Sequence, residues 1–276
     1  MGPAAVVALA AIQLSVQARA VEPGELVAIT IVLPEHRDAV RVRAFDHEVA
    51  AFEVDDHAWR ALVGIDLDVK PGAYIVTVDA GPGLAATTTL AVAPHRFPTR
   101  RLTVDEAFVT PPPEVTDRIA GEAALLEATW RDATPHRLWS TSFVRPVPQP
   151  ANSRFGTRSI FNGKPRAAHG GADFLSPAGT PIHAPNAGRV AIARDMYFTG
   201  NTVVIDHGLG IFSMLAHLSA IEVDEGELVE ADQLVGLVGA TGRVTGPHLH
   251  WAVRANGARV DPLSLLALLG SGASGR

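Results

Sequence analysis

The chain has 276 residues, no cysteine and a formal net charge of −6, with 47% hydrophobic and 19% charged residues. This length predicts about two domains, and the absence of cysteine excludes thiolate metal sites, cysteine nucleophiles and disulfides. The net negative charge, without a run of Lys and Arg, argues against a protein that binds nucleic acid or an anionic membrane, since both functions need clustered basic residues.

The first ten residues are small and apolar, without the Lys or Arg that opens an ordinary signal peptide. We expect residues 1–10 to be a truncated or atypical signal segment, followed directly by the first strand. Apolar and polar residues alternate from Ile12 to Arg19, which is the period of a half-buried strand. No apolar stretch is long enough for a helix that spans a bilayer, so no transmembrane segment is expected.

Short strands separated by turns are predicted through residues 11–95. Pro-Gly pairs and other turn residues bound four apolar runs, at 26–32, 40–45, 73–78 and 87–92. About seven short strands with regular turns favour a β-sandwich of immunoglobulin-like type.

Residues 96–150 are predicted to connect two domains. A strand-like stretch over 101–109 is followed by three prolines, which suit the start of a helix. Apolar residues then recur at helical spacing and predict one amphipathic helix of about five turns: Val115, Ile119, Ala123, Leu126 and Trp130. We expect this helix to pack against a neighbouring domain.

Short strands return over residues 151–266, which we expect to form a second domain. The clearest strand candidates are 190–194, 202–206, 211–216 and 248–254. Asp261-Pro262 predicts the start of a short helix over Leu263 to Leu269, with Gly270 as its stop. The tail from Ser271 to Arg276 is expected to be disordered, and the domain division assigns residues 267–276 to this disordered tail.

Six of the 11 histidines lie between residues 169 and 250, which makes this stretch the candidate functional region. In His248-Leu249-His250, residues two apart on a strand point to the same face, so both imidazoles project together. Histidine pairs of this kind also occur on ordinary surfaces, so the pair alone leaves metal binding open.

A second polar group lies at His169-Gly170-Gly171-Ala172-Asp173. Two glycines disfavour a helix, and in an extended segment His169, Gly171 and Asp173 share one face, with Gly171 leaving space for a cation. Imidazole and carboxylate are both zinc ligands, and three protein ligands leave one position open for water. A polar turn held by its own hydrogen bonds is the alternative for this pentapeptide.

A third histidine, His217, ends an apolar strand candidate. A lone histidine in this position is more often structural than catalytic. A zinc peptidase, however, needs a base and a donor for the tetrahedral oxyanion beside its three ligands, so the three elements together point to such a site.

The second domain resembles a known enzyme family. The matching segments occur in the family's order: Arg154 to Arg158, His169 to Asp173, Gly179 to Pro185, Gly200 to Gly208, Ala216 to Ser219, Gly239 to Gly242 and Thr245 to His250. On these motifs the chain is similar to the lysostaphin/LytM-type zinc metallopeptidases, which are endopeptidases of bacterial peptidoglycan. Residues 59–65 and 71–74 are similar, more loosely, to the accessory sandwich of periplasmic members.

The resemblance implies a mainly β fold with an antiparallel-sheet peptidase domain, in an exported protein of the periplasm or cell envelope. It implies one Zn²⁺ ion held by His169, Asp173 and His250. It also gives His248 and His217 catalytic roles, which we assign as general base and as oxyanion stabiliser or proton donor, respectively. The two roles can be exchanged, because a neutral imidazole beside a zinc-activated water suits either residue.

Two further residues are candidate contacts of the substrate or oxyanion. Tyr197 matches a family tyrosine and is predicted either to donate its hydroxyl to the oxyanion or to pack. Arg158 is predicted to meet a substrate carboxylate or to anchor its loop. Leu215 stands where family members commonly carry Tyr, so one aromatic contact is expected to be missing. His183 and His207 are expected either to be structural or to support the metal ligands from behind.

The function that this resemblance implies is hydrolysis of the peptide cross-links between peptidoglycan stem peptides. Some LytM-type domains have lost zinc ligands and instead bind and activate a cell-wall amidase, which is the alternative function. The complete ligand set favours the enzyme, and a purely structural zinc site would have four protein ligands. The sequence leaves open the oligomeric state and a regulatory envelope protein as partner.

Overall fold

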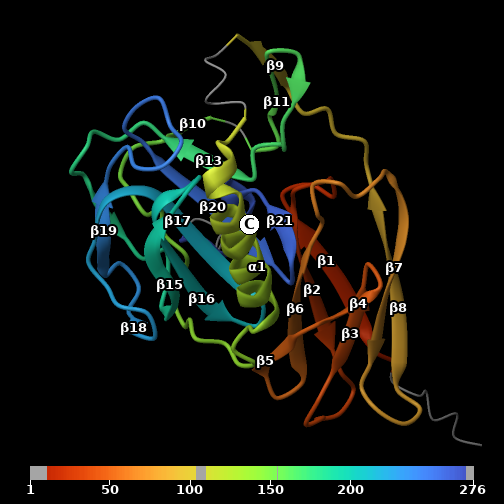
Figure 1. The fold of residues 1–276 in the computed structure, drawn as a ribbon. Coiled ribbons are helices and arrows are strands. Elements are labelled where there is room, and N and C mark those ends of the chain that lie inside the picture. Colours follow the sequence, from red (N-terminus) through yellow and green to blue (C-terminus); the bar gives the residue numbers. More distant parts are fainter. Residues whose placement is uncertain (1–10, 104–109, 154, 272–276) are drawn as a thin grey trace, which may run out of the picture.

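Two β-rich domains lie side by side in the computed structural model of the chain, which describes residues 11–103, 110–153 and 155–271 (Figure 1). Strands are the main element of both domains, which confirms the predicted fold class. The predicted signal segment 1–10 and residues 104–109 of the predicted strand-like stretch lie outside the described residues.

The N-terminal domain is a sandwich of two four-stranded antiparallel sheets, red to orange in Figure 1. In the order of pairing, one sheet consists of β1 (Gln13–Ala18), β2 (Leu26–Val32), β6 (Ala58–Gly64) and β5 (Ala51–Asp55). The other consists of β4 (His47–Val49), β3 (Arg41–Ala44), β7 (Gly72–Asp79) and β8 (Ala85–Val92). The core lies between them, where alternate residues of β7 are buried. The sandwich agrees with the expectation, and its immunoglobulin-like type stays a prediction.

The connector contributes one strand and one long helix. β9 (Thr99–Leu102) pairs in parallel with β11 (Arg158–Phe161), and β11 also pairs with β12 (Lys164–Pro165). A 3-10 helix, η2 (Pro113–Val115), leads into α1 (Thr116–Arg131), which has 16 residues or about 4.4 turns. The predicted amphipathic helix is thus present. No helix within the described ranges is long and apolar enough to cross a membrane.

The C-terminal domain is built on a ten-stranded antiparallel sheet. Its central path runs through β10 (Ala151–Ser153), β13 (Gly171–Phe174), β20 (Leu249–Ala255), β17 (Ile211–Ile221), β16 (Gly200–Gly208), β15 (Gly188–Met196) and β18 (Leu228–Val229). Off this path lie β14 (Pro181–His183), β19 (Leu234–Val238) and β21 (Ala258–Val260). Three of the four strand candidates of this region fall within observed strands, and the fourth, 248–254, begins one residue before β20.

The two faces of this sheet are covered differently. Side chains alternate along β20, so Leu249, Trp251 and Val253 enter the main core while His250 points to the opposite face. The helix α1 lies in front of that opposite face (Figure 1). Its Trp130 packs against a smaller apolar cluster of buried residues from β15, β16 and β17. The connector is therefore anchored on the face of the sheet to which His250 points.

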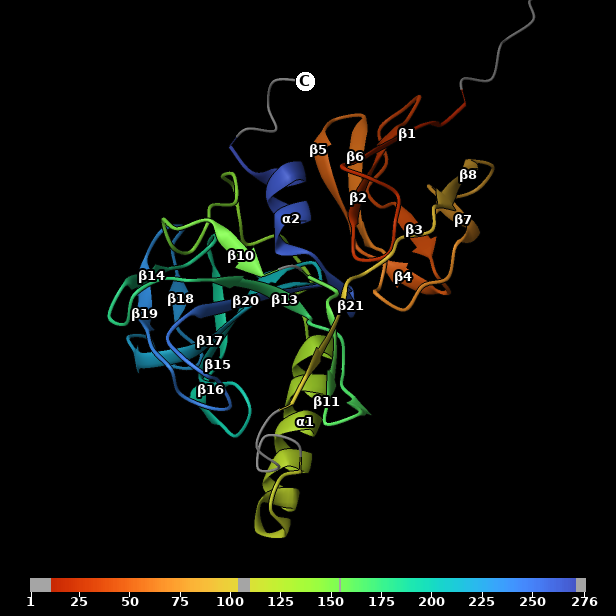
Figure 2. The same ribbon diagram turned by 90° about the horizontal axis from the view of Figure 1, so that it is seen from above.

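A second helix, α2 (Pro262–Leu269), lies between the two domains (Figure 2). Asp261 caps it as predicted, because its side chain accepts a hydrogen bond of 3.0 Å from the Leu263 backbone N–H. The predicted helix over Leu263 to Leu269 is confirmed, since α2 ends at Leu269. The assignment of residues 267–269 to a disordered tail is wrong, because they belong to α2 and Leu268 is buried. The helix continues because apolar side chains of its last turn, such as Leu268, pack into the main core. Residues 272–276 lie outside the described part of the chain.

Polar contacts join the two domains around α2. The Ser264 hydroxyl donates to Glu25 at 2.7 Å and accepts from the Leu26 N–H at 2.9 Å. Farther along the interface the guanidinium of Arg259 donates to the Asp66 carboxylate at 2.6 Å. Because Ser264 and Glu25 are buried, each supplies the hydrogen-bond partner that the other needs away from water.

One buried histidine of the C-terminal domain has a structural role. His207, on β16, is fully buried, with its Nδ1 2.8 Å from the Ala187 carbonyl oxygen and its Nε2 3.0 Å from Ser213 Oγ. The carbonyl can only accept, so Nδ1 carries the hydrogen and Nε2 accepts from the hydroxyl. Burial lowers the pKa of His207 to about 4. The predicted structural role agrees with this environment.

Acid is expected to destabilise the protein in part through His207. Between pH 6.5 and about 4 the unfolded side chain takes up a proton and the buried one does not, so the free energy of unfolding falls as the pH is lowered through this window. The fall amounts to as much as about 3 kcal/mol and levels off below pH 4, where both states are protonated. Urea unfolding at several pH values measures it.

The His207→Gln variant should lose this part of the pH dependence, whereas replacing the exposed His57 by Gln should leave it unchanged. An unaltered slope in His207→Gln would show that His207 does not titrate in this way.

Candidate metal centre and its cavity

The pairing of two strands brings two predicted ligands together. β13 and β20 are antiparallel neighbours, and their register places Asp173 directly opposite His250. Opposite residues point to the same face of a sheet. Their sequence neighbours Ala172 and Trp251 are buried in the main core on the other face. Core packing thus sets the register that aims both polar side chains toward α1.

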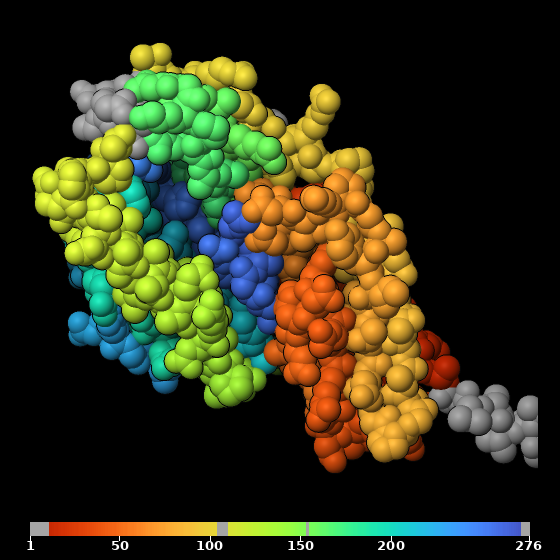
Figure 3. All heavy atoms as spheres, turned by 45° about the vertical axis from the view of Figure 1, so that its right-hand side comes forward, coloured from red at the N-terminus to blue at the C-terminus, as the bar shows by residue number. Residues whose placement is uncertain are grey.

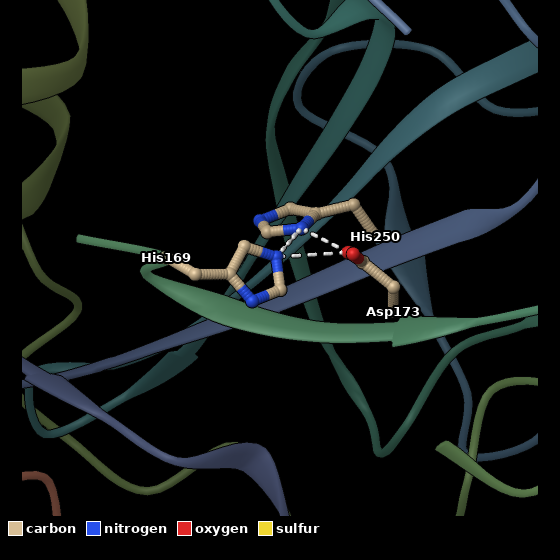
Figure 4. Close-up of side chains that lie close together, drawn as sticks. All are labelled: His169, Asp173 and His250. Atoms are coloured by element: carbon tan, nitrogen blue, oxygen red, sulfur yellow. Dashed lines mark hydrogen bonds and ion pairs between the residues drawn. The ribbon is translucent and has the colours of Figure 1, made fainter. Parts of the chain in front are cut away.

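The third predicted ligand, His169, lies two residues before β13 (Figure 4). Its Nε2 is 2.9 Å from Asp173 Oδ1 and 3.2 Å from His250 Nδ1, and His250 Nδ1 is 2.8 Å from Asp173 Oδ1. Three possible ligand atoms therefore converge at one place, as they do around a single metal ion.

A glycine between these ligands is required by close packing. A Cβ atom at Gly171 would lie 2.8 Å from two ring atoms of His250 and 2.4 Å from the carbonyl oxygen of Trp251. The second contact is with backbone, so the strand itself would have to shift. The space at Gly171 thus accommodates the imidazole of His250, in addition to the gap for a cation that the sequence suggested.

Replacing Gly171 by Ala is expected to displace His250 and weaken metal binding by about 10- to 100-fold, the usual effect of disturbing the support of a ligand. The neighbouring glycine provides a matched control, because a Cβ at Gly170 would meet nothing within 4 Å. Titration of the metal-free variants with metal, followed by calorimetry, compares the two. Equal affinities in Gly171→Ala and Gly170→Ala would contradict the packing argument.

His248 lies immediately before β20 and faces the same side as His250. Its Nε2 is 3.9 Å from Asp173 Oδ1, and its Nδ1 is 2.9 Å from the Gly246 carbonyl oxygen. The carbonyl can only accept, so Nδ1 carries the hydrogen and Nε2 of the neutral ring keeps its lone pair. This tautomer suits a base that takes up a proton at Nε2.

A bulge in β17 aims His217 at the same site. Between the pairs Val203–Leu215 and Asn201–Leu218, β17 advances by three residues while β16 advances by two. His217 lies within this bulge and has a φ of +69°, in the left-handed region where histidine is found more often than most residues. The bulge interrupts the alternation of the strand and changes the direction of this one side chain.

The ring of His217 is held beside the other histidines. Its centroid is 4.9 Å from that of His248 and 6.0 Å from that of His250, and its Nδ1 is 3.0 Å from the Thr241 carbonyl oxygen. His217 and His248 thus share one pattern, in which Nδ1 is tied to a carbonyl and Nε2 is left for chemistry. The structure brings both predicted catalytic residues to the three predicted ligands.

Burial and hydrogen bonds shift the pKa values of the ligand residues. Burial by itself raises the pKa of Asp173, but hydrogen bonds from His169 and His250 outweigh it and hold that pKa well below its usual value. Burial lowers the pKa of His250 more than Asp173 raises it. An ionised carboxylate and a neutral imidazole are the states in which both groups offer a lone pair to a cation.

The site opens into a cavity of about 760 Å³, visible in Figure 3 as a hollow between yellow-green α1 and the green segment around β11. A second cavity, of about 320 Å³, lies on the other side of His250 and is lined by residues of α1. His250 borders both cavities, so α1 forms one wall beside the ligand group. The side chains of His169, Asp173 and His250 are 18%, 21% and 13% exposed, which leaves them accessible to a small molecule.

Two predicted contact residues do not line these cavities. Arg158 is exposed on β11, and the alternation of that strand presents Ser159 and Phe161 to the larger cavity instead. Tyr197 packs against Phe198, which lines the cavity, and its backbone N–H donates to the side chain of Glu122 on α1 at 2.8 Å.

Three arginines that the sequence did not single out line the larger cavity: Arg100, Arg166 and Arg243. They come from β9, from the chain between β12 and β13, and from the chain between β19 and β20. No spacing in the sequence connects these positions, so only the fold could bring them together.

Comparisons with known proteins find relatives of the C-terminal domain. A family model described as Peptidase family M23 matches residues 167–262. Peptidoglycan DD-endopeptidase ShyA of Vibrio cholerae is 41% identical over 113 residues, and DD-carboxypeptidase/endopeptidase Mpg of Neisseria meningitidis is 42% identical over 97 residues. These matches cover 41% and 35% of this chain but 26% and 22% of the relatives. The chain thus spans about a quarter of the length of these curated relatives.

A solved structure extends the likeness to most of the chain. The crystal structure of a Pseudomonas aeruginosa protein assigned to peptidase M23 is 34% identical and superimposes with a TM-score of 0.71, covering 89% of this chain and 95% of that chain. The match therefore includes more than the C-terminal domain. On this likeness over most of both chains, and as the lysostaphin/LytM-type motifs indicated, the chain belongs to peptidase family M23.

Proposed function

We propose that the protein is a zinc-dependent endopeptidase that hydrolyses the peptide cross-links of bacterial peptidoglycan. The observation that carries this proposal is the meeting of His169, Asp173 and His250 with His217 and His248 at one accessible cavity. The names of the relatives, peptidoglycan DD-endopeptidase and DD-carboxypeptidase/endopeptidase, support the substrate class. We place the protein in the periplasm or cell envelope, where such a substrate is found.

The three ligand atoms fit a zinc ion. Atoms bound at about 2.0–2.1 Å to a tetrahedral zinc ion are about 3.3 Å apart. The observed separations between His169 Nε2, Asp173 Oδ1 and His250 Nδ1 are 2.8 to 3.2 Å, so a small outward movement of the side chains accommodates the ion. Two imidazoles and one carboxylate form a donor set that zinc accepts, and they leave one position open.

The protein side chains supply the proton transfers of the proposed reaction. A zinc ion held by this group would activate a water molecule and polarise the scissile carbonyl. His248 would accept the proton of the attacking water at Nε2, with its Nδ1–H held by Gly246. Burial lowers the pKa of His217 to about 4, so its ring, fixed through Thr241, is neutral at neutral pH. His217 would donate to the oxyanion or to the leaving amine after it takes up a proton from solvent at Nε2. Because both rings have the same Nδ1 arrangement, the roles can be exchanged.

The alternative function, activation of a cell-wall amidase by binding, has less support. Regulatory domains of that kind have lost ligands, whereas this chain keeps all three and both histidines close by. A regulatory envelope protein as a partner of the enzyme stays a proposal.

Digestion of purified peptidoglycan tests the proposed function. Mass spectrometry of the soluble products should show cross-linked muropeptides cut to monomers, and a chelator should stop the reaction until zinc is added back. Zinc-loaded protein that leaves the cross-links intact would rule out the endopeptidase. Stimulation of a purified amidase by the same preparation would then favour the alternative.

A further inference from the structure

The turn between β15 and β16, residues 197–199, holds the backbone of His217. His217 lies in the bulge of β17 and has no register partner in any of the described strand pairings of β17. Its backbone N–H therefore needs an acceptor outside the ladder, and it donates to the Thr199 carbonyl oxygen at 2.8 Å. Thr199 and its neighbour Phe198 also line the larger cavity. The 197–199 turn is thus part of the surroundings of the candidate metal centre.

The same turn is followed by residues that pack against the segment holding the imidazole of His217. The Thr241 carbonyl oxygen lies 3.0 Å from Nδ1 of His217. A Cβ atom at Gly200, directly after the turn, would lie 2.3 Å from the carbonyl carbon and from Oγ1 of Thr241. The Asn201 N–H donates to the same Thr241 hydroxyl at 2.9 Å. The backbone and the ring of His217 are therefore held by two segments in contact with each other, so a shift of the turn moves the ring.

Helix α1 is bonded to this turn through the carboxylate of Glu122. Its Oε2 accepts a hydrogen bond of 2.8 Å from the Tyr197 backbone N–H. Its Oε1 accepts from Nε of Arg118 at 2.6 Å, and Arg118 also donates to the Asp195 carboxylate of β15 at 2.8 Å. The Glu122 side chain is 17% exposed, whereas those of Arg118 and Asp195 are 45% and 61% exposed. Water weakens the exposed ion pair more than the shielded bond to Tyr197, so Glu122 makes the firmer of these links.

The apolar contacts of α1 lie farther along the helix. Leu125, Leu126 and Trp130 pack against the smaller apolar cluster of β15, β16 and β17. Apolar packing has no preferred direction, so it fixes the helix on the sheet without orienting the turn. The directed contact between α1 and the 197–199 turn is the hydrogen bond of Glu122.

We propose that Glu122 is a positioning residue for His217: by holding the 197–199 turn, it keeps the His217 ring aimed at the candidate metal centre. The inference rests on the proposed function, because it takes His217 as a catalytic group. Glu122 lies outside residues 167–262, the part of the chain that the family model matches, so a residue of the connector supports the site of the peptidase domain. Its consequence is that loss of the Glu122 carboxylate slows the chemical step and leaves the metal in place.

Two replacements of Glu122 test this role. Alanine removes the acceptor, whereas glutamine keeps an oxygen that accepts from the Tyr197 N–H. Both are strong helix formers, as glutamate is, so α1 itself is preserved. With zinc-loaded full chains and a cross-linked muropeptide dimer, Glu122→Ala should lower kcat by about 10- to 100-fold, the loss expected when a catalytic group is slightly misplaced. The variant should retain one zinc ion per chain, and Glu122→Gln should restore most of the rate.

The split between kcat and KM distinguishes positioning of His217 from a direct contact with substrate. Phe198 of the same turn lines the cavity, so a turn that only contacts the substrate would change KM and leave kcat unaltered. That result would overturn the inference. Equal losses of kcat in both Glu122 variants would overturn it as well, because the acceptor oxygen would then not be the cause. As a matched control, Asp117→Ala removes an exposed carboxylate of the same helix and should leave both constants at their wild-type values.

A spectroscopic measurement keeps this inference separate from the proposed function. Nitrogen NMR of the zinc-loaded full chain, with its histidines isotope-labelled, reports which ring nitrogen of His217 carries the hydrogen, and His217→Gln identifies the signals. The wild type should carry it at Nδ1, as the Thr241 carbonyl oxygen requires. Glu122→Ala should show a mixture of the two tautomers, and Glu122→Gln should show the wild-type pattern.

These signals and the rates together separate the two proposals. The expected change of tautomer in Glu122→Ala, in a protein that cleaves no cross-links, would support the positioning role and contradict the endopeptidase. Cleavage at one rate by the wild type and both Glu122 variants, with identical His217 signals, would support the endopeptidase and contradict the positioning role.

Discussion

Replacing His250 by Ala is expected to abolish bound metal and peptidase activity together. His250 Nδ1 lies within 3.2 Å of the atoms of the other two proposed ligands, so its loss leaves His169 and Asp173 as the only members of the group. Two ligands do not hold zinc against dialysis as three do. Metal content by plasma mass spectrometry and cleavage of a muropeptide dimer measure the two losses, and activity should fall to that of the chelated wild type.

The control for this experiment is the exposed His57 of the N-terminal domain, whose replacement by Ala should change neither quantity. Circular dichroism should show that His250→Ala keeps its fold, because the core residues on either side of it in β20, Leu249 and Trp251, are untouched. One metal ion retained per chain in the folded variant would contradict the assignment of His250 as a ligand.

His248→Ala should give the opposite combination, a metal-loaded protein with little turnover. Its Nε2 lies 3.9 Å from Asp173 Oδ1, farther than the His169 and His250 atoms, and its Nδ1 is tied to Gly246. Removal of a general base costs about 10²- to 10⁴-fold in kcat. Metal content should stay at one ion per chain, and KM should change much less than kcat.

A His217→Ala variant, measured in the same way, compares the two catalytic histidines. Native turnover in His248→Ala with a large loss in His217→Ala would exchange the roles assigned to them. Loss of metal from His248→Ala would instead make His248 a ligand.

Local patterns in the sequence predicted most of the elements that build the site. The apolar runs at 26–32 and 211–216 lie within observed strands, and the capping Asp261 begins a helix as expected. These features depend on the backbone and on near neighbours, which a sequence shows directly. The assignment of residues 267–269 to a disordered tail failed because it ignored the core that Leu268 enters, a contact with distant parts of the chain.

The candidate contact residues show the limit of the same approach. Arg158 belongs to a matching motif, yet it is exposed on β11 and does not line the cavities. Arg166 and Arg243 carry no signal of their own, but the fold places both in the cavity wall. Whether a side chain in an irregular segment faces a cavity depends on what packs beneath it, and spacing along the chain does not contain that information.

By itself the sequence determined the mainly β fold, the histidine-rich region and, through its motifs, the family. The tertiary structure decided how these residues meet: the register of β13 and β20 places Asp173 opposite His250, and a bulge in β17 brings in His217. Hydrophobic periodicity and helix capping depend on residues that are close together in the sequence, so the sequence alone shows them. Register, bulges and cavity walls arise from burying residues far apart in sequence, such as Ala172 and Trp251, and exist only in the folded protein.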